Sequence, residues 1–342
     1  MSTDELYMQR ALALARLGTG KVSPNPLVGC VIVQDNKIIG EGWHQQYGGP
    51  HAEVNAIRSV EDQSVLPQST LYVTLEPCSH FGKTPPCADL IIEKKIKRVV
   101  IANGDPNPLV NGKGIKKLKD NGIQVDTEVL ASQGLQLNKR FFTFIQKERP
   151  FIILKWAQTT DGFIAKKNYD SKWISHEQSR QLVHKWRAEE DAVLVGARTA
   201  QHDNPILNVR NWTGRNPARI VLDRFLRLSD KLHLFDRSQL TFCYNVLKHE
   251  EHENLSLIRV AEENFIQQVV HDLYQRKIQS IIVEGGALTL NLFLESGLWD
   301  EARIFHSPKT FGDGIRAPLL SDWVENRFVI GVDELAVHQN PY

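Results

Sequence analysis

Residues 70–87 read TLYVTLEPCSHFGKTPPC, and this stretch decides how the first half of the chain folds. Its opening LYVTL alternates strongly and weakly apolar positions, which predicts a β-strand over 70–75. Two cysteines follow the strand, Cys78 and Cys87, and Cys87 opens a further run that predicts a helix. A strand that leads into a helix, with another strand at 98–102, indicates a layered α/β fold.

The sequence upstream of this stretch extends the same pattern. Ser2 and Glu5 form a capping-box pair, which predicts a helix to about Gly18. The segment VGCVIVQDNKIIGEGWH predicts a hairpin, because two apolar runs flank the polar turn 34–36. The order helix, hairpin, helix, strand, helix, strand predicts a three-layer α/β/α domain, whose remaining elements are 51–60, 70–75, 87–95 and 98–102.

A break in the pattern at 147–150 predicts a boundary between two domains, 1–146 and 147–342. Here the charged tripeptide KER and a proline interrupt two apolar runs, FFTFI and FIILKWA. The second half resumes an α/β pattern, in which Ser175 and Gln178 predict the capped start of the first helix. Further helices are expected at 262–274 and 287–295, and strands at 151–157, 191–197, 218–223, 240–245 and 278–286.

The composition excludes several classes of protein. The 342 residues suffice for two domains of about 150 residues each. Lys and Arg total 41 against 40 Asp and Glu, so no net field attracts nucleic acid or anionic lipid, and we expect a small-molecule partner. Four cysteines are too few for a disulfide scaffold, and we see neither a signal-peptide start nor an apolar run of membrane-spanning length. We therefore expect reduced thiols and a cytoplasmic location.

Four residues of the first half form a zinc-site pattern: His51, Glu53, Cys78 and Cys87. One imidazole and two thiolates leave the fourth tetrahedral position open, which is typical of a catalytic rather than a structural zinc. Water bound there becomes hydroxide near neutral pH and can attack an electron-poor ring carbon that bears an amino group. The reaction also needs a carboxylate that is not a ligand to move protons, and we assign this role to Glu53.

The spacing restricts where these side chains can lie. His51 and Glu53 are two residues apart, so on a regular helix they would point to different sides. They can converge only at an irregular helix start, which the preceding GGP at 48–50 makes available. Eight residues separate Cys78 from Cys87, instead of the two in the general zinc deaminase signature. A loop of this length does not prevent zinc binding if its two ends return to the same metal ion. The partial positive charge at a helix start would also favour the thiolate form of a cysteine there.

Together with SPNPLVGCVIV, GEGWH and HAE upstream, TLEPCSHFGKTPPC resembles the deaminase half of the bifunctional riboflavin biosynthesis proteins, a family with this long cysteine spacing. The resemblance implies a fold similar to cytidine deaminase, zinc on the three ligands named above, and Glu53 as the proton shuttle. The family's substrate is a diaminopyrimidinone that carries a phosphoribosylamino group. We expect it to be contacted by Asn25, His44, Lys83 and Thr84. The lysine of this set stands where arginine is common in the family.

The segments FIILKWAQTTDG, SKWIS, HKWRAEEDAVLVGARTAQHDNPILNVR and VEGGALTLNLFLESGLWDE resemble, in order, the reductase half of the same family. The resemblance implies a fold similar to dihydrofolate reductase, in which NADPH delivers hydride to a ring-opened or imine form of the ribose. Cofactor contacts are expected from Ala157, Trp173, Thr199, Asp203, Gly286, Ala287, Leu288, Thr289, Leu290, Asn291 and Leu292. Substrate contacts are expected from Ser171, Arg187, Leu207, Arg210 and Glu284. Asn204 and Arg224 depart from the residues that the family commonly has.

The residue types agree with this reading. The glycine pair 285–286 lies between a predicted strand and a predicted helix, and would let a cofactor phosphate reach the N–H groups of the helix start. Arg187 and Arg210 could form two-point hydrogen bonds with a substrate phosphate. Lys155 and Asp203 are our candidates for polarising the sugar carbon and relaying protons.

Two other functions stay open at this point. The first is a nucleic-acid base deaminase with an appended recognition domain, although the balanced charge and the absence of a basic, aromatic-rich stretch count against it. The second is a non-enzymatic module in which the metal only stabilises the fold and Glu53 has no role. Our prediction is a homo-oligomeric two-domain enzyme that deaminates a phosphoribosylated pyrimidine with zinc and then reduces its ribosyl chain with NADPH.

Overall fold

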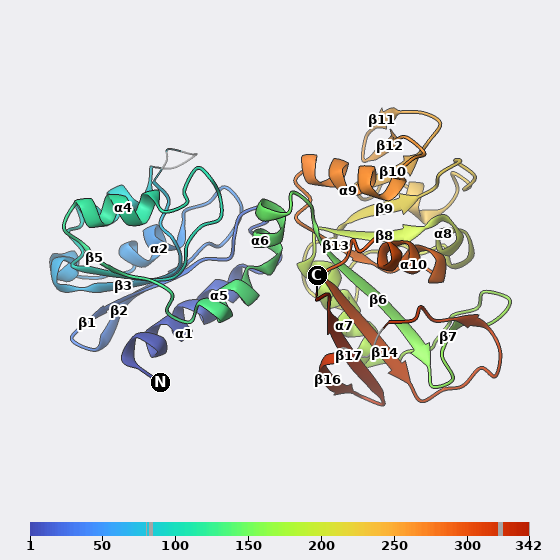
Figure 1. Cartoon of the computed structure of the whole chain (residues 1–342), viewed down its shortest axis with the longest axis horizontal. Coiled ribbons are helices and arrows are strands. Elements are labelled where there is room, and N and C mark those ends of the chain that lie inside the picture. Colours follow the sequence, from blue (N-terminus) through green and yellow to red (C-terminus); the bar gives the residue numbers. More distant parts are fainter. Residues whose placement is uncertain (80, 82–84, 321–323, 342) are drawn as a thin grey trace. The chain divides into compact units, whose positions relative to one another are not determined.

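The chain forms two compact units, Met1–Lys147 and Glu148–Tyr342, and each unit has its own main sheet (Figure 1). The fold is α/β in both units. The structure is a computed structural model, and it describes residues 1–79, 81, 85–320 and 324–341.

The first unit is a five-stranded sheet in the order β2-β1-β3-β4-β5. Strand β1 pairs antiparallel with β2 and β3, whereas β3, β4 and β5 run parallel. The strands are β1 (Gly29–Gln34), β2 (Lys37–Trp43), β3 (Thr70–Leu75), β4 (Arg98–Asn103) and β5 (Gln124–Asp126). The helices are α1 (Thr3–Ala15), α2 (Ala52–Arg58), α3 (Cys87–Glu93), α4 (Lys113–Asp120), α5 (Ala131–Leu137) and α6 (Lys139–Gln146), with 3-10 turns η1 (Arg16–Gly18) and η2 (Gln63–Gln68).

Apolar side chains on both faces of this sheet hold three layers together. Helix α1 packs Met8 and Leu12 against one face, in the same core as Val31. Helices α2 and α3 cover the other face, where Ile91 shares a core with Ile32 (Figure 1). Successive strand residues point to opposite faces, so the neighbours Val31 and Ile32 belong to different cores. The predicted α/β/α arrangement is therefore confirmed.

Most elements that the sequence predicted in this unit are present. Strand β3 occupies the predicted range, and Ser2 and Glu5 form the predicted capping box, with the Ser2 N–H donating to Glu5 Oε2 at 2.7 Å. In the hairpin turn, Asp35 and Asn36 both adopt left-handed backbone angles, as a two-residue hairpin turn requires. The sequence did not predict α4, β5 and α5, which are short elements stabilised by packing on the sheet.

The second unit is a ten-stranded mixed sheet in the order β11-β12-β10-β9-β8-β13-β6-β14-β17-β16. The strands from β12 to β14 in this order are parallel, and β11, β17 and β16 each pair antiparallel with a neighbour. Its strands are β6 (Phe151–Thr159), β8 (Ala192–Gly196), β9 (Ala218–Leu222), β10 (Thr241–Asn245), β11 (Glu250–His252), β12 (Leu255–Arg259), β13 (Ser280–Val283), β14 (Glu301–Ser307), β16 (Val324–Ile330) and β17 (Asp333–Gln339). Two short strands, β7 (Phe163–Ala165) and β15 (Ile315–Arg316), pair separately.

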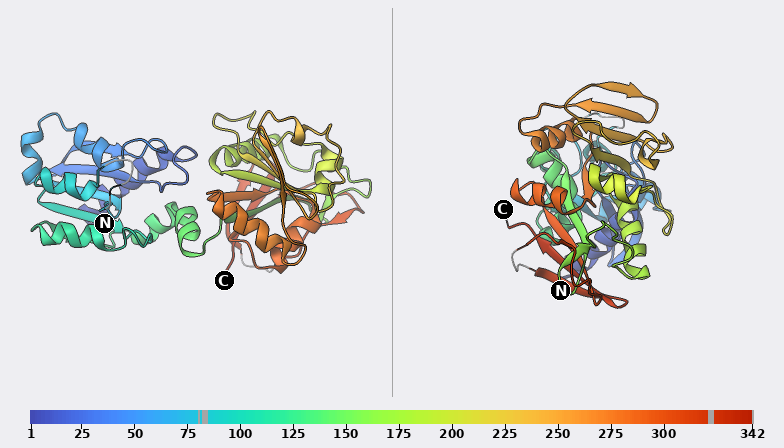
Figure 2. Two further views of the ribbon diagram at one scale, coloured as in Figure 1. Left: turned by 90° about the horizontal axis from the view of Figure 1, so that it is seen from above. Right: turned by 90° about the vertical axis from the view of Figure 1, so that its right-hand side faces the viewer.

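Helices cover both faces of this sheet, which is visibly twisted in Figure 2. They are α7 (Glu177–Glu189), α8 (Ala197–Asp203), α9 (Phe265–Gln275) and α10 (Ala287–Glu295), with a 3-10 turn η3 (His233–Phe235). Helices α9 and α10 pack Val269 and Phe293 on one face, and α7 packs Trp186 on the other. The sequence did not predict β14, β16 and β17, which extend the sheet to one edge.

The start of α7 differs from the prediction. Its N-cap is His176 and not Ser175, and the His176 Nδ1 accepts a hydrogen bond from the N–H of Gln178 at 3.4 Å. Asp333 of β17 explains the difference, because its carboxylate accepts hydrogen bonds from the His176 N–H and the Ser179 hydroxyl, both at 2.6 Å. A partner 157 positions along the chain is not visible in the local sequence.

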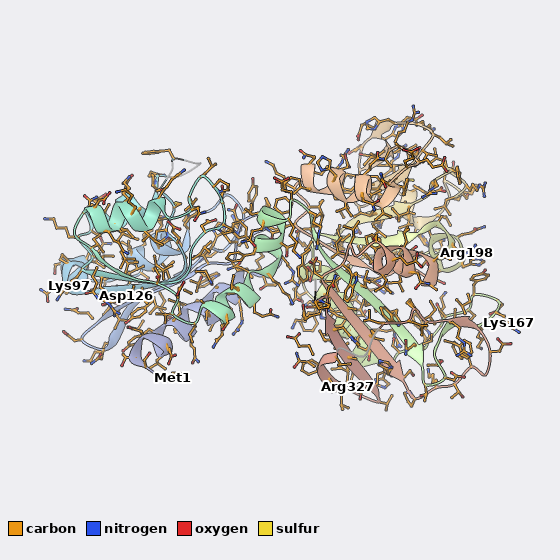
Figure 3. The ribbon with its side chains drawn as sticks, in the orientation of Figure 1. Met1, Lys97, Asp126, Lys167, Arg198 and Arg327 are labelled. Carbon is orange, nitrogen blue, oxygen red and sulfur yellow. The ribbon has the colours of Figure 1, made fainter. Side chains whose placement is uncertain are left out.

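Charged side chains lie on the surface of both units. Lys97, Lys167 and Arg327 are examples of exposed side chains on the outside of their units (Figure 3). None of the helices in the described part of the chain combines the length and the apolar character needed to cross a bilayer.

Candidate metal centre and reductase cavity

His51, Cys78 and Cys87 come together in the first unit. The His51 Nδ1 lies 3.6 Å from Cys78 Sγ and 3.3 Å from Cys87 Sγ, and the three potential ligand atoms lie within 4.8 Å of one another. For comparison, a nitrogen and a sulfur bound tetrahedrally to one zinc ion, at bond lengths of about 2.0 and 2.3 Å, lie about 3.5 Å apart. One nitrogen and two sulfurs at these separations fit a zinc ion with a fourth position for water or substrate.

The start of helix α2 lets His51 and Glu53 converge. His51 is the N-cap, with extended backbone angles of φ −72° and ψ 165°, so it lies just outside the regular helix. Glu53 lies in the first turn, and its side chain is buried close enough to His51, Cys78 and Cys87 for their charges to affect its ionisation. The irregular helix start that the spacing required is therefore present.

Burial sets the ionisation of Glu53. Loss of solvent raises the pKa of this carboxyl group to about 6, against the opposing attraction of His51. A carboxyl group whose pKa lies near neutrality can accept and release a proton at the pH at which enzymes work. Its position beside the three ligand atoms is what a proton shuttle for metal-activated water needs.

Helix α3 brings the two cysteines together. Cys87 is its first residue, and the Cys87 N–H donates a hydrogen bond to Cys78 Sγ at 3.3 Å. The N–H of Ala88 donates to the Cys78 carbonyl oxygen at 3.1 Å, which holds the loop end against the helix. Hydrogen bonds from Cys87 and then from His51 lower the pKa of Cys78. The thiolate is the form that binds a metal.

Glu76, which the sequence reasoning missed, anchors the segment that carries Cys78. It is buried at the end of β3, two residues before the cysteine. Its carboxylate accepts hydrogen bonds at 2.9 to 3.3 Å from the backbone N–H groups of Asp105, Gly112, Gly114 and Ile115. These bonds tie the Cys78 segment to the loop before α4 and to the first turn of that helix. The sequence feature that could have indicated this anchoring role is the acidic residue directly before Pro77 and Cys78.

Two of the predicted deaminase contacts, Asn25 and His44, lie beside the metal centre. The ring of His44 meets that of His51 edge-on, with centroids 5.6 Å apart. The His44 Nδ1–H donates to the carbonyl oxygen of the residue before His51 at 3.0 Å, so its Nε2 is the acceptor for the Asn25 amide, also at 3.0 Å. The other two predicted contacts, Lys83 and Thr84, lie outside the described residues.

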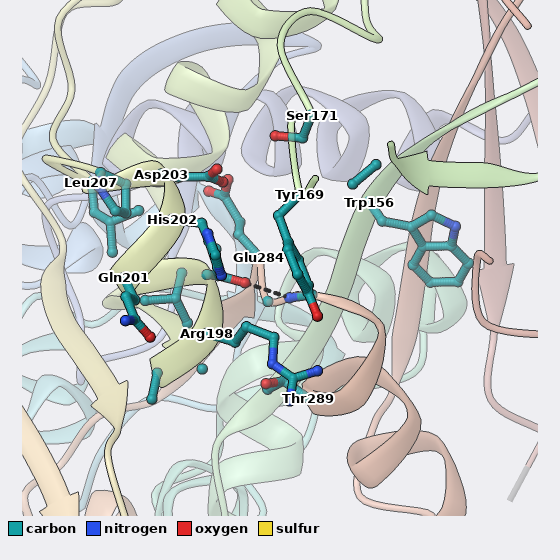
Figure 4. Close-up of a pocket in the computed structure, with 18 of the residues that line it drawn as sticks. Trp156, Tyr169, Ser171, Arg198, Gln201, His202, Asp203, Leu207, Glu284 and Thr289 are labelled. Carbon is teal, nitrogen blue, oxygen red and sulfur yellow. Dashed lines mark hydrogen bonds between the residues drawn. The ribbon is translucent and has the colours of Figure 1, made fainter. Parts of the chain in front are cut away.

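The second unit contains a cavity of about 1050 Å³ at the carboxyl ends of its parallel strands (Figure 4). This volume is at the upper end of the range for small-molecule sites, and suits a cofactor with a substrate. The predicted reductase residues that line it are Lys155, Ala157, Ser171, Trp173, Arg187, Thr199, Asp203, Leu207, Arg210, Glu284, Gly286, Ala287, Leu288, Thr289 and Leu292.

Leu290 and Asn291 are not among the residues that line this cavity. The Leu290 side chain is fully buried and packs with Phe293 in the core beneath α10. On a helix only part of each turn can face one side, which explains why these two residues do not line the cavity. The helical period places Leu288, Thr289 and Leu292 on the cavity side instead.

Arg187 and Glu284 bind each other in the cavity. The Nε and Nη2 of Arg187 donate to the two Glu284 carboxylate oxygens at 2.7 and 2.9 Å, and its Nη1 donates to the Asn208 carbonyl oxygen at 3.2 Å. Three of the five N–H donors of the Arg187 guanidinium are therefore engaged within the protein. Arg210 also lines the cavity, and among the described residues it makes one hydrogen bond, to Asn208 Oδ1 at 3.1 Å.

Several further side chains of the cavity were missed. His184 lies about one turn before Arg187 on α7, and its Nδ1–H donates to the Asn208 carbonyl oxygen at 3.1 Å. Burial and then the charge of Arg187 lower its pKa to about 4, so the imidazole is neutral. Tyr169 and His202, which also line the cavity, stack on each other with ring centroids 4.3 Å apart (Figure 4). The helical spacing of His184 and Arg187 was the available signal.

The start of α10 lies close to α8 and to the end of β8. The Gly286 N–H donates to Oγ1 of Thr199 in α8 at 2.8 Å. A Cβ at Gly196, the last residue of β8, would lie 2.2 Å from Thr289 Oγ1, so a larger residue there would displace at least the Thr289 side chain. The arrangement leaves the N–H groups of Ala287 and Leu288 at the cavity, where the helix start favours a phosphate.

Comparison with known proteins agrees with both sites. Residues 1–103 match the model of the cytidine and deoxycytidylate deaminase zinc-binding region, and residues 150–326 match that of the RibD C-terminal domain. The chain is 42% identical to the riboflavin biosynthesis protein RibD of Aquifex aeolicus, over 91% of this chain and 89% of that protein. For RibD of Escherichia coli the identity is 37%, over 92% and 90%.

Solved structures match the whole chain. One is the diaminohydroxyphosphoribosylaminopyrimidine deaminase/5-amino-6-(5-phosphoribosylamino)uracil reductase of Thermotoga maritima, with a TM-score of 0.90 and 40% identity over 99% of each chain. Another is Acinetobacter baumannii RibD, with a TM-score of 0.89 and 32% identity over 98% of each. Both halves of the chain thus match proteins of the same fold over nearly their full length. The chain belongs to the RibD family, the zinc-dependent deaminases and NADPH-dependent reductases of riboflavin biosynthesis.

Proposed function

We propose that the domain 1–146 hydrolytically deaminates 2,5-diamino-6-(phosphoribosylamino)pyrimidinone, and that the domain 147–342 reduces the ribosyl chain of the product to ribityl with NADPH. The observation that carries the first half is the cluster of His51, Cys78 and Cys87 with a buried carboxyl group beside it. The second half is supported by the cavity and by the names of the Thermotoga relative.

In the deaminase site, Glu53 performs the proton transfers. A zinc ion held by His51, Cys78 and Cys87 would supply a Lewis acid that activates water for attack on the ring carbon. Glu53 takes a proton from the attacking water, delivers it to the ring nitrogen, and then transfers the next proton to the departing ammonia. The amide of Asn25, held by His44, is placed to orient the polar ring.

In the reductase site, NADPH would supply a hydride to the sugar carbon of the ring-opened or imine form, and the reduction also needs one proton. Burial lowers the pKa of Lys155 and raises that of Asp203, which brings both groups closer to neutral pH. Lys155 polarises the reacting carbon and Asp203 relays the proton. The remaining predicted contacts orient the reactants: Ala157, Trp173, Thr199 and the start of α10 for the cofactor, and Ser171, Leu207 and Glu284 for the substrate.

We assign the binding of the substrate phosphate in this site to Arg210. Arg187 holds Glu284 instead, and keeps that carboxylate charged next to Lys155. The pKa of Arg210 is lowered by partial burial, which indicates a guanidinium that an incoming phosphate would stabilise.

The test is an assay of the full chain on the diaminopyrimidine phosphate, with ammonia release and NADPH absorbance followed separately. We expect ammonia without NADPH, and NADPH oxidation only after deamination. Arg210→Ala should leave ammonia release unchanged and raise the KM of the reduction. Loss of both activities in this variant would contradict two separate sites, and ammonia release only from polynucleotide would establish the nucleic-acid base deaminase instead.

The nucleic-acid alternative is not favoured by the comparisons, because relatives in riboflavin biosynthesis cover both halves of the chain.

A cytoplasmic location is supported by the four cysteines, which occur as free thiols. A homo-oligomer is supported by the edge strand β16, where Phe328 and Val329 are exposed. Light scattering of the purified protein would test this last proposal, and a monomeric mass would contradict it.

A further inference from the structure

The cavity crosses the ends of several parallel strands in a known order. From the reacting centre outward, the strands follow in the order β6, β13, β8 and β9. Leu154 of β6 pairs with Val283 of β13, and Val283 pairs with Leu194 of β8. Further along, Gly196 of β8 pairs with Leu222 of β9. Neighbouring strands lie about 4.8 Å apart, so the end of β9 lies roughly 10 Å from that of β13. A cofactor with its reacting end at β6 and its diphosphate at the start of α10 therefore directs its adenosine toward β9. This step rests on the proposed NADPH site.

Arg224 occupies the end of β9. It follows the strand by two residues and lines the cavity, with a side chain about 40% exposed. Its guanidinium lies over the ring of Phe265, 4.8 Å from the ring centroid, which orients the group. Its charged neighbour is Glu262, at 4.0 Å and mostly exposed, and within the described parts of the chain no acceptor hydrogen-bonds to this guanidinium. The donors of Arg224 are thus oriented but not engaged.

The acidic residue at the same strand end, Asp223, also lines the cavity, but its carboxylate is already engaged by backbone N–H groups. Asp223 is buried, and its two carboxylate oxygens accept hydrogen bonds from the N–H groups of Arg227 and Leu228 at 3.0 and 2.9 Å. An available carboxylate here would hydrogen-bond a ribose hydroxyl and repel a phosphate. With that carboxylate enclosed by its own loop, the charge offered at this position is positive, from Arg224 and from Arg227, which also lines the cavity.

We propose that Arg224 recognises the 2′-phosphate of NADPH and thereby makes the reductase prefer NADPH to NADH. A guanidinium can donate two parallel hydrogen bonds to a phosphate, which a ribose hydroxyl cannot match. Arg227 adds positive charge on the same loop. When the 2′-phosphate binds, a charge-assisted hydrogen bond replaces the weak, exposed contact between Arg224 and Glu262.

The experiment compares Arg224→Gln with wild type in the full chain. Binding of NADPH, NADH, adenosine 2′,5′-bisphosphate and ADP is measured by calorimetry, so the readout does not depend on turnover. The variant should lose about tenfold or more in affinity for the two ligands with a 2′-phosphate, and keep its affinity for the other two. Arg237→Gln is the matched control, because Arg237 is exposed in the same unit and does not line the cavity.

Each outcome decides the matter. If wild type binds none of the four ligands, the proposed reductase site fails, and this inference fails with it. If wild type prefers NADPH and Arg224→Gln keeps that preference, Arg224 is not the recognition residue although the NADPH site stands. Arg198 at the start of α8 also lines the cavity, so loss of the preference in Arg198→Gln alone would overturn the assignment as well.

Discussion

Arg187 and Glu284 form a two-point ion pair in the reductase cavity, with nitrogen to oxygen distances of 2.7 and 2.9 Å. Both side chains are almost fully buried, and Lys155 Nζ lies 3.8 Å from one carboxylate oxygen. Glu284 thus faces two positive charges, and although burial opposes ionisation, the charges of Arg187 and Lys155 lower its pKa to about 2. The pair connects α7 to the loop after β13.

We expect Glu284→Gln to destabilise the second unit in a pH-dependent way. The neutral amide leaves the charges of Arg187 and Lys155 uncompensated, which should cost about 3 kcal/mol at neutral pH. The folded pKa of about 2 lies below the ordinary 4.5, so the stabilisation by Glu284 is complete above about pH 4.5 and is lost as the pH falls toward 2. Urea unfolding should show a larger difference between variant and wild type at pH 7 than at pH 3.

The control for this measurement is Glu262→Gln, which neutralises an exposed carboxylate in the same unit. We expect it to change the free energy of unfolding by less than about 0.5 kcal/mol at either pH. A Glu284→Gln effect of equal size at both pH values would show that the carboxylate charge contributes nothing.

Glu53→Gln should abolish deamination and spare the metal. The amide keeps the shape of the side chain but cannot accept and release protons, so ammonia release should fall by about a hundredfold or more. Zinc content should stay at the wild-type value, because Glu53 is not one of the three clustered ligand groups. NADPH oxidation with supplied deaminated substrate should be unchanged. Wild-type ammonia release from this variant would favour a metal with a purely structural role.

Glu76→Ala should loosen the metal centre. It removes the acceptor of four backbone N–H groups and frees the Cys78 segment, so a chelator should extract zinc about tenfold faster or more. Glu76→Gln, which keeps one carbonyl oxygen, should give an intermediate rate. Glu93→Ala, an exposed change at the end of α3, is the control. A wild-type zinc release rate in Glu76→Ala would refute the anchoring role.

Gly196→Ala should distort the cofactor side of the reductase cavity. The new Cβ would lie 2.2 Å from Thr289 Oγ1, so the Thr289 side chain or the start of α10 that carries it must shift, and we expect NADPH affinity to fall about tenfold. The double variant Gly196→Ala with Thr289→Ala removes that oxygen and should recover most of the affinity. Calorimetric titration with NADPH measures both, and failure of the second change to restore binding would show that the clash is not the cause.

Local patterns were sufficient for much of the first unit. The alternation in 70–75 and the Ser2–Glu5 capping box are interactions between near neighbours, and both are present. The zinc ligands could be predicted because the chemistry needs one imidazole and two thiolates, whatever the loop between them. The two-residue spacing of His51 and Glu53 even required an irregular helix start, which the structure contains.

What the sequence by itself determined about this protein was therefore the order of strands and helices in the first unit as far as β4, the residues of its candidate metal centre and its family. Only the tertiary structure decided which charges neutralise each other: Glu284 occupies Arg187 from 97 positions away, and Asp333 sets the start of α7 from the last strand. The backbone N–H groups that donate to the Glu76 carboxylate likewise lie 29 to 39 positions further along the chain. The physical reason is that spacing along the chain controls hydrogen bonds within one turn or strand, whereas pairing between distant side chains depends on how the sheet brings its strand ends together.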